Sequence, residues 1–215
     1  MSLFQPLSPR QVHLVKEAGG EAVFVQADVT KASDIKAMVQ KTVETYGRLD
    51  YAFNNAGSGT SGKIADLSEA DWDFEINANL KSVWLSMKYE IPVMQRSGGG
   101  AIVNTSSQGA LLGVANYGAY GAAKAGVIAL SRAAAAEYSA DGIRINTVSP
   151  GAVKTDLWAQ APPEMLEQVA AGIPLQRIGV PEDIAETVVW LCSDGAAFVT
   201  GHNLVVDGGF TAVQK

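Results

Sequence analysis

The sequence predicts an α/β fold, a doubly wound parallel sheet with helices on both faces. Apolar runs of strand length alternate with longer stretches of helical periodicity, which is the pattern of such a sheet. The chain has 215 residues, of which 47% are hydrophobic and 18% charged, and this suits one domain with a sizeable core. No internal repeat or linker divides the chain, so we expect residues 1–215 to form a single domain.

Five apolar runs are expected to be strands, and four periodic stretches are expected to be helices. The strands are residues 22–27, 49–54, 101–105, 143–148 and 203–206, and the helices are residues 33–46, 71–96, 117–139 and 181–192. Pro92 lies inside the second helix, so we expect a bend or a local shift in hydrogen bonding there. Residues 155–171 are polar and contain prolines, which predicts a mobile flap. Its Trp158 and Met165 either line a substrate pocket or anchor the flap.

Tyr120 and Lys124 are spaced so that they share one face of the third predicted helix. A phenol can donate or accept an alcohol proton, and a nearby ammonium favours the phenolate. Free tyrosine has a pKa near ~10, so a base near neutrality needs a depression of ~2–3 units, or roughly 3–4 kcal/mol. The pair also occurs by chance in many helices, so by itself it does not establish chemistry.

Two polar residues accompany this pair. Ser107 stands thirteen residues before Tyr120, after the strand at residues 101–105, and Asn79 lies further upstream. Open α/β sheets bind ligands at the carboxyl ends of their strands. We therefore expect Ser107 to hold a substrate oxygen and Asn79 to anchor a water that leads protons in from solvent. Ser106 is interpreted as structural, and Tyr117, which has no lysine four residues later, as packing or as part of the cleft.

Further motifs have an order and spacing that resemble the short-chain dehydrogenase/reductase family. They are Asn54-Asn55-Ala56-Gly57 after an apolar strand, Asn79-Leu80-Lys81-Ser82, Ser106-Ser107, Tyr120 with Lys124, Pro150-Gly151 with Thr155, and the ending at residues 201–209. The resemblance runs from about residue 9 to the C-terminus. It implies a Rossmann-like fold and hydride transfer between NAD or NADP and an alcohol or ketone substrate.

The resemblance also implies a role for each matching residue. The catalytic residues would be Asn79, Ser107, Tyr120 and Lys124, and those that bind the cofactor would be Asp28, Asn54, Ala56, Gly57, Tyr120, Lys124, Pro150, Gly151, Val153 and Thr155. The Val153 backbone and the Thr155 hydroxyl would hold the nicotinamide carboxamide. Two residues have equally good local alternatives, since the Asn54 amide can tie adjacent strand ends together and Asp28 can cap a helix.

The start of the chain departs from the family, whose members open with a strand, a Gly-rich turn, a helix and a second strand. Residues 1–8 match none of these, and no glycine precedes Gly19. We therefore expect a truncated fold that lacks the first two strands, the first helix and the turn that holds pyrophosphate. The edge at residues 49–54 would pair with residues 22–27, be covered by another chain, or be left open by a poorly ordered N-terminal segment.

Residues 57–62 match the dinucleotide pattern G-x-G-x-x-G letter for letter. A functional match must open a helix at once, so that the helix N-terminus faces the pyrophosphate. Here the next helix cap is expected only at Ser68 or Asp71. We interpret this segment as a loop beside the substrate cleft.

Composition excludes several classes of function. The net charge of −6, without a Lys/Arg cluster, argues against nucleic acid or an anionic membrane as a partner. Cys192 is the only cysteine and there are two histidines, so neither an intrachain disulfide nor a Cys/His metal site is expected. No apolar run has transmembrane length and no signal peptide pattern is present, so the cytoplasm is the expected location.

Three readings of function remain open. The first is an NAD(P)-dependent oxidoreductase, which the resemblance implies to be a homo-oligomer, a dimer or tetramer. The second is a non-catalytic fold that keeps the catalytic residues but no longer binds a dinucleotide. The third is an ordinary enzyme with a misassigned or incomplete start. The sequence does not distinguish NAD from NADP and does not name the substrate.

Overall fold

The computed structural model describes residues 9–155 and 161–213. It contains one sheet of parallel strands in the order β1-β2-β3-β4, as the alternating pattern predicts. The strands are β1 Tyr51–Asn54, β2 Gly100–Thr105, β3 Ile143–Pro150 and β4 Asn203–Val206. Each parallel pair is joined by a connection that contains a helix, so all four carboxyl ends meet at one edge of the sheet.

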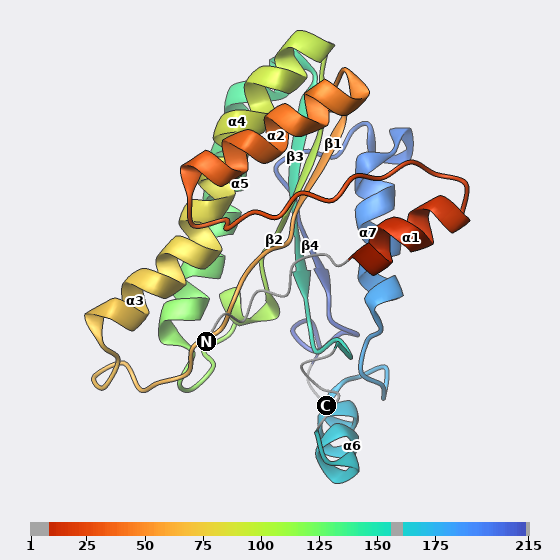
Figure 1. Cartoon of the computed structure of the whole chain (residues 1–215). Coiled ribbons are helices and arrows are strands. Elements are labelled where there is room, and N and C mark those ends of the chain that lie inside the picture. The colour runs from red at the N-terminus through yellow and green to blue at the C-terminus, as the bar shows by residue number, and fades with distance from the viewer. Residues whose placement is uncertain (1–8, 156–160, 214–215) are drawn as a thin grey trace.

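Helices cover both faces of the sheet (Figure 1). The α-helices of the described chain are α1 Pro9–Glu17, α2 Ala32–Tyr46, α3 Glu69–Ile76, α4 Ser82–Ser97, α5 Gly118–Tyr138, α6 Pro163–Gly172 and α7 Pro181–Cys192. In Figure 1, α2, α4 and α5 lie on one side of the strands and α7 lies on the other. None of the helices in the described part of the chain is long and apolar enough to cross a membrane.

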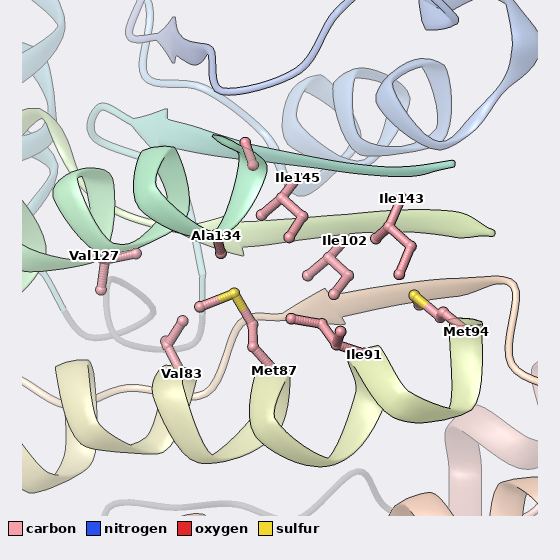
Figure 2. Packing of buried hydrophobic residues seen from close by; sticks show 10 residues of the cluster. Val83, Met87, Ile91, Met94, Ile102, Val127, Ala134, Ile143 and Ile145 are labelled. Carbon is pink, nitrogen blue, oxygen red and sulfur yellow. The ribbon is translucent and has the colours of Figure 1, made fainter. Parts of the chain in front are cut away.

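The core has two parts because neighbouring residues of a strand point to opposite faces. On one face, Ile102 of β2 packs with residues of α4, α5 and β3, as Figure 2 shows. The buried members of this cluster are Val83, Met87, Ile91, Met94, Ile102, Val127, Ala134, Ala135, Ile143 and Ile145. On the other face, Val103 packs with Val148 and with Val188 and Leu191 of α7. The central strand β2 is therefore buried on both faces.

The edge strand β1 is covered much less completely. Ala52 packs against the core, whereas Tyr51 is 58% exposed and Phe53 is 42% exposed. The expected strand at residues 22–27 is wrong: these residues form no strand and lead through an irregular segment from α1 to α2. An apolar run becomes a strand only when a neighbour supplies hydrogen-bond partners, and residues 22–27 pair with no strand in the described chain.

The long predicted helix at residues 71–96 forms, but its irregularity does not lie at Pro92. The helix changes to a π-helical turn at Asn77–Lys81, between α3 and α4, and continues through Pro92. Pro92 is exposed, so water can solvate the carbonyl that its missing N–H leaves unpaired. The expected interruption at Pro92 is therefore corrected to a π turn that contains Asn79.

The segment expected to be a flap contains α6, so its second half is helical. Met165 on this helix is 50% exposed. Trp158 lies outside the described residues. The single cysteine, Cys192, is partly buried at the end of α7.

Candidate active site

The candidate site residues gather where the parallel strands end. Asn54 at the end of β1 is in register with Asn104 of β2, and β2 ends at Thr105. β3 ends at Pro150 on the same edge. The helix α5 packs across β2 and β3 and brings its first turns to this edge. The site thus occupies the position where open α/β sheets bind ligands.

Tyr120 and Lys124 lie one turn apart in α5, as their spacing predicts. Lys124 is only 4% exposed, and its Nζ donates to the backbone oxygen of Thr105 at 2.9 Å. The same Nζ lies 5.8 Å from the centroid of the Tyr120 ring. The Lys124 ammonium is therefore held between the end of β2 and the phenol, with one hydrogen bond to the strand.

The electrostatics of this pair differ from the expectation that Lys124 depresses the phenol. Burial raises the pKa of Tyr120, the Ser107 hydroxyl opposes this rise, and the charge of Glu75 adds to it. Burial also lowers the pKa of Lys124 to about 8, although Glu75 acts in the opposite direction. In this structure the phenol is consequently harder to ionise than free tyrosine, because desolvation outweighs the hydrogen bond with Ser107.

The two serines after β2 have different surroundings. Ser107 caps a 3-10 turn at Gln108–Ala110, and its Oγ accepts from Gly109 N at 3.1 Å. A Cβ added to Gly109 would lie 3.5 Å from Ser107 Oγ and 3.6 Å from Tyr120 Cε1, so both side chains border this glycine. Ser106 is buried instead, and its hydroxyl donates to the Lys124 carbonyl at 2.8 Å. The interpretation of Ser106 as structural agrees with this contact.

Asn79 lies in the π turn and is completely buried. Its Nδ2 donates to the Glu75 backbone oxygen at 3.1 Å and to Glu75 Oε2 at 2.9 Å. Its Oδ1 accepts from Ser58 N at 3.2 Å. A Cβ added to Gly57 would lie 2.7 Å from Asn79 Oδ1 and 3.3 Å from Lys124 Nζ, so the two polar groups meet at Gly57.

Glu75 is the residue of this neighbourhood that the sequence analysis missed. It is 0% exposed, although its helix α3 is otherwise largely exposed. The available signal was its position four residues before Asn79, which places the two on one helix face. A single acidic residue in a polar helix does not reveal burial, so only the tertiary structure brings it to the site.

The residues expected to approach a cofactor at the end of β1 have a clear structural role. Asn54 Nδ2 donates to Asn104 Oδ1 at 2.9 Å and to Glu90 Oε2 at 3.1 Å, so its amide does tie adjacent strand ends together. Ala56 and Gly57 follow in an exposed loop. Their small side chains leave the backbone accessible to a bound group, which is consistent with the expected contact.

Asp28 does not follow a strand, because the strand expected at residues 22–27 does not form. Its Oδ1 accepts from the Thr30 backbone N–H at 3.0 Å and from the Thr30 hydroxyl at 2.7 Å, and its Oδ2 lies 3.3 Å from Lys31 Nζ. The side-chain hydrogen bond from Thr30 is the largest influence that lowers the pKa of Asp28. The alternative in which Asp28 caps a helix is wrong in this structure, because the N-cap of α2 is Lys31 and no side chain forms a capping hydrogen bond there.

The segment after β3 is fixed by close packing. A Cβ added to Gly151 would lie 2.8 Å from Asp207 Cα, so only glycine fits beside that backbone. Val153 forms an isolated bridge with Gly179, which holds the loop at the sheet edge. The chain therefore leaves β3 after Pro150 and passes along the sheet edge through Gly151 and Val153. Thr155, the last residue of the first described range, is exposed.

The glycine-rich loop at residues 57–62 does not open a helix. Gly62 forms a bridge with Tyr117, a turn follows, and α3 begins at Glu69 with Ser68 Oγ as its cap. Its Gly59 borders Tyr117 and Tyr120. The loop thus lies beside the candidate site, as expected for a cleft loop.

The residues present fit one part of a nicotinamide dinucleotide better than the other. Near the sheet edge, the Lys124 ammonium and the Tyr120 phenol can bond ribose hydroxyls beside the accessible backbone of residues 56–57. For the pyrophosphate, the described residues offer no glycine turn that opens a helix. They also contain no cluster of three or more His, Cys, Asp or Glu that could hold a metal ion.

The fold and the site define an α/β protein with Ser107, Tyr120 and Lys124 gathered near its strand ends, and sequence comparison places it in a family. A family model described as enoyl-(acyl carrier protein) reductase matches residues 4–211. Cyclohexanol dehydrogenase of Acinetobacter sp. is 46% identical over 195 residues, which cover 90% of this chain and 76% of that protein. A 2-(S)-hydroxypropyl-CoM dehydrogenase of Xanthobacter autotrophicus is 39% identical over 219 residues, covering 99% and 86% of the two chains.

Solved structures agree with this placement. ElxO with NADP bound superposes with a TM-score of 0.89 at 33% identity, covering 95% of this chain and 84% of that one. Levodione reductase gives a TM-score of 0.89 at 32% identity, covering 96% and 84%. The chain belongs to the short-chain dehydrogenase/reductase family and has its Rossmann-like α/β fold.

Proposed function

We propose that this chain is an oxidoreductase that transfers hydride between NAD(H) or NADP(H) and an alcohol or ketone substrate. The observation that supports the proposal most directly is the convergence of Ser107, Tyr120 and Lys124 at the carboxyl edge of the sheet. The names of similar proteins, which include a cyclohexanol dehydrogenase, favour secondary alcohols as the substrate class.

Each candidate catalytic residue has a role that its surroundings allow. Tyr120 exchanges the proton of the substrate hydroxyl, and Ser107 holds the substrate oxygen beside the phenol. Lys124 supplies positive charge next to the ring, and Asn79 supports the path by which protons reach the site. The raised pKa of Tyr120 keeps the phenol protonated at neutral pH, so the free site is prepared to donate a proton in ketone reduction.

A bound nicotinamide cofactor would supply the hydride chemistry, while the protein supplies position and electrostatics. Lys124 and Tyr120 would hold its ribose, and Asn54, Ala56 and Gly57 would lie along it. Pro150, Gly151, Val153 and Thr155 would hold the carboxamide end. Asp28 is the proposed contact to adenine, although its carboxylate already serves Thr30.

The second candidate function is a protein that keeps this constellation but binds a dinucleotide weakly or not at all. It is favoured by one observation, that no glycine turn in the described residues opens a helix toward the site. Contacts to the nicotinamide half alone would have to provide the affinity.

Calorimetric titration with NADH and then with NADPH separates the two candidates. Saturable binding at micromolar concentrations supports the oxidoreductase and identifies the preferred cofactor. A screen of secondary alcohols and ketones would follow, with Tyr120→Phe as the inactive control. No heat at millimolar cofactor would instead favour the second candidate.

A further inference from the structure

Glu75 is a buried carboxylate at the candidate site that the proposed reaction does not use. We propose that Glu75 is a positioning residue, which fixes the orientation of the Asn79 amide and clamps the loop of residues 57–62 beside Tyr120. Its importance for catalysis rests on the proposed function. The arrangement itself can be tested on the free chain, without substrate or cofactor.

The Glu75 carboxylate is held by three hydrogen bonds. Its Oε1 accepts from the backbone N–H and from the hydroxyl of Thr60, both at 2.6 Å. Its Oε2 accepts from Asn79 Nδ2 at 2.9 Å. Among the described residues, no lysine or arginine forms an ion pair with Glu75. A buried carboxylate is tolerated only when hydrogen-bond donors replace water. Thr60 and Asn79 supply these donors, so breaking the contact with either residue would leave one carboxylate oxygen without a partner.

The contact with Glu75 determines which way the Asn79 amide points. Asn79 Nδ2 faces two acceptors, the backbone oxygen and the carboxylate of Glu75, while Asn79 Oδ1 faces the N–H of Ser58. A flipped amide would place oxygen against oxygen and a nitrogen donor against a nitrogen donor. The Glu75 carboxylate, the Glu75 backbone oxygen and the Ser58 N–H therefore all favour the same orientation of the amide.

This orientation reaches the other site residues through the glycines of the loop. Gly57 lies between Asn79 Oδ1 and Lys124 Nζ, and Gly59 borders the ring of Tyr120. Thr60 anchors the same loop to the Glu75 carboxylate. One side chain thus connects the π turn, the loop and the phenol–ammonium pair.

Glu75 also brings negative charge to both titrating groups of the pair. It raises the pKa of Lys124 against the larger effect of burial, and it raises the pKa of Tyr120 in addition to burial. The other groups that act on the phenol are Ser107 and Tyr117. Neutralising Glu75 should therefore lower the pKa of Tyr120.

The first test is Glu75→Gln, which keeps the size of the side chain and removes its charge. The new side-chain amide can still accept from Thr60 through its oxygen, but its nitrogen then faces Asn79 Nδ2, a second donor. An unpaired buried donor corresponds to about a ten- to hundredfold change in an equilibrium constant. We expect deuterium exchange in residues 57–62 to accelerate by about that factor. Asp73→Asn, an exposed acid on the same helix, is the matched control and should change nothing.

The second test rebuilds a donor–acceptor pair between positions 75 and 79, with the negative charge moved from position 75 to position 79. In the double variant Glu75→Gln/Asn79→Asp, the amide introduced at position 75 can donate to the carboxylate introduced at position 79. That carboxylate can still accept from Ser58 N, but one of its oxygens then faces the backbone oxygen of residue 75, to which Asn79 Nδ2 donates in the parent protein. Exchange in residues 57–62 should therefore be slower in the double variant than in Glu75→Gln, without reaching the parent rate.

A third readout separates positioning from general packing. The Tyr120 phenol is titrated by ultraviolet absorbance, as the difference between each protein and the same protein carrying Tyr120→Phe. We expect a lower apparent pKa in Glu75→Gln, a recovery toward the parent value in the double variant, and no shift in Asp73→Asn. Both readouts use the free chain, so failure of cofactor binding would not affect them.

Three outcomes would overturn the proposal. Unchanged exchange and an unchanged Tyr120 titration in Glu75→Gln would show that Glu75 positions neither the loop nor the charge. Effects as large in the double variant as in Glu75→Gln would indicate a packing defect instead of a lost orientation. If Glu75→Gln does not fold, the double variant decides, and its failure to fold would contradict the pairing argument.

Discussion

Removing the hydroxyl of Ser106 or of Ser107, the two residues that follow β2, should affect different properties: stability in the first case and turnover in the second. Ser106→Ala loses a buried hydrogen bond to the Lys124 carbonyl, which should cost about 1 kcal/mol of unfolding free energy. Ser107→Ala leaves the core intact and should lower kcat by ~10²–10³, because it removes the group that holds the substrate oxygen. Denaturant unfolding and turnover of both variants check this, and the reverse pattern would assign Ser106 to the substrate.

The phenol of Tyr120 is the group on which the proposed reaction depends. Tyr120→Phe should reduce kcat by ~10²–10⁴, the range typical of a lost general acid or base. Tyr117→Phe is the matched control, since its ring packs edge-to-face against Tyr120 at 6.3 Å but has no lysine one turn later. Turnover that survives in Tyr120→Phe, measured with the same substrate, would remove Tyr120 from the mechanism.

At the residue scale, the sequence predicted that Tyr120 and Lys124 lie side by side on one helix, but it did not predict the direction in which the pKa of Tyr120 shifts. The spacing of Tyr120 and Lys124 placed both in the first turns of α5, and strand ends brought Ser107 and Asn54 to the same edge. The direction of the pKa shift of Tyr120 could not be predicted, because it depends on burial. Burial depends on residues far away in the sequence, such as Glu75.

At the scale of elements, α4 contacts β1 through a hydrogen bond between the buried Glu90 carboxyl and the Asn54 amide. This contact should make the free energy of unfolding depend on pH. Burial raises the pKa of Glu90 from 4.5 to about 7, and the Asn54 amide partly offsets this. Because the folded state favours the neutral acid, the contribution of Glu90 is fully present below pH 4.5 and is lost as the pH rises to about 7. The loss corresponds to about 3 kcal/mol.

Glu90→Gln should abolish this dependence while it keeps an acceptor for Asn54. Unfolding free energies measured between pH ~4 and ~8 should then fall less with rising pH in the variant than in the parent protein. Glu137→Gln, an exposed acid on α5, is the control and should follow the parent protein. A variant with the same pH dependence as the parent would show that Glu90 stays ionised in the folded state.

A second prediction at the scale of elements concerns the turn after β3. Gly151→Ala places a methyl group 2.8 Å from the Asp207 backbone, so the connection between β3 and β4 must shift. We expect a loss of about 1–3 kcal/mol, typical of overpacking, and thermal unfolding measures it. Gly113→Ala meets no atom within 4 Å and should leave Tm nearly unchanged. Equal Tm values for the two variants would contradict the tight packing.

At the scale of the whole molecule, the exposed apolar residues support the proposed homo-oligomer. On α4, Trp84 is 43% exposed, with Lys88 Nζ 5.1 Å from its ring centroid. Sedimentation should show a dimer or tetramer. Trp84→Glu should shift it toward smaller species, whereas Glu137→Gln should not. A monomeric parent protein would contradict this expectation.

The sequence by itself determined the class of fold and predicted candidate residues for the site. Its apolar runs and helical periods predicted the parallel sheet β1 to β4 and the helices that cover it, because local periodicity reflects which face is buried. The tertiary structure alone decided the rest. It left residues 22–27 without a partner strand, moved the helix irregularity from Pro92 to Asn79, and buried Glu75 beside the site. Strand pairing and desolvation depend on neighbours from other parts of the chain, and no local pattern encodes them.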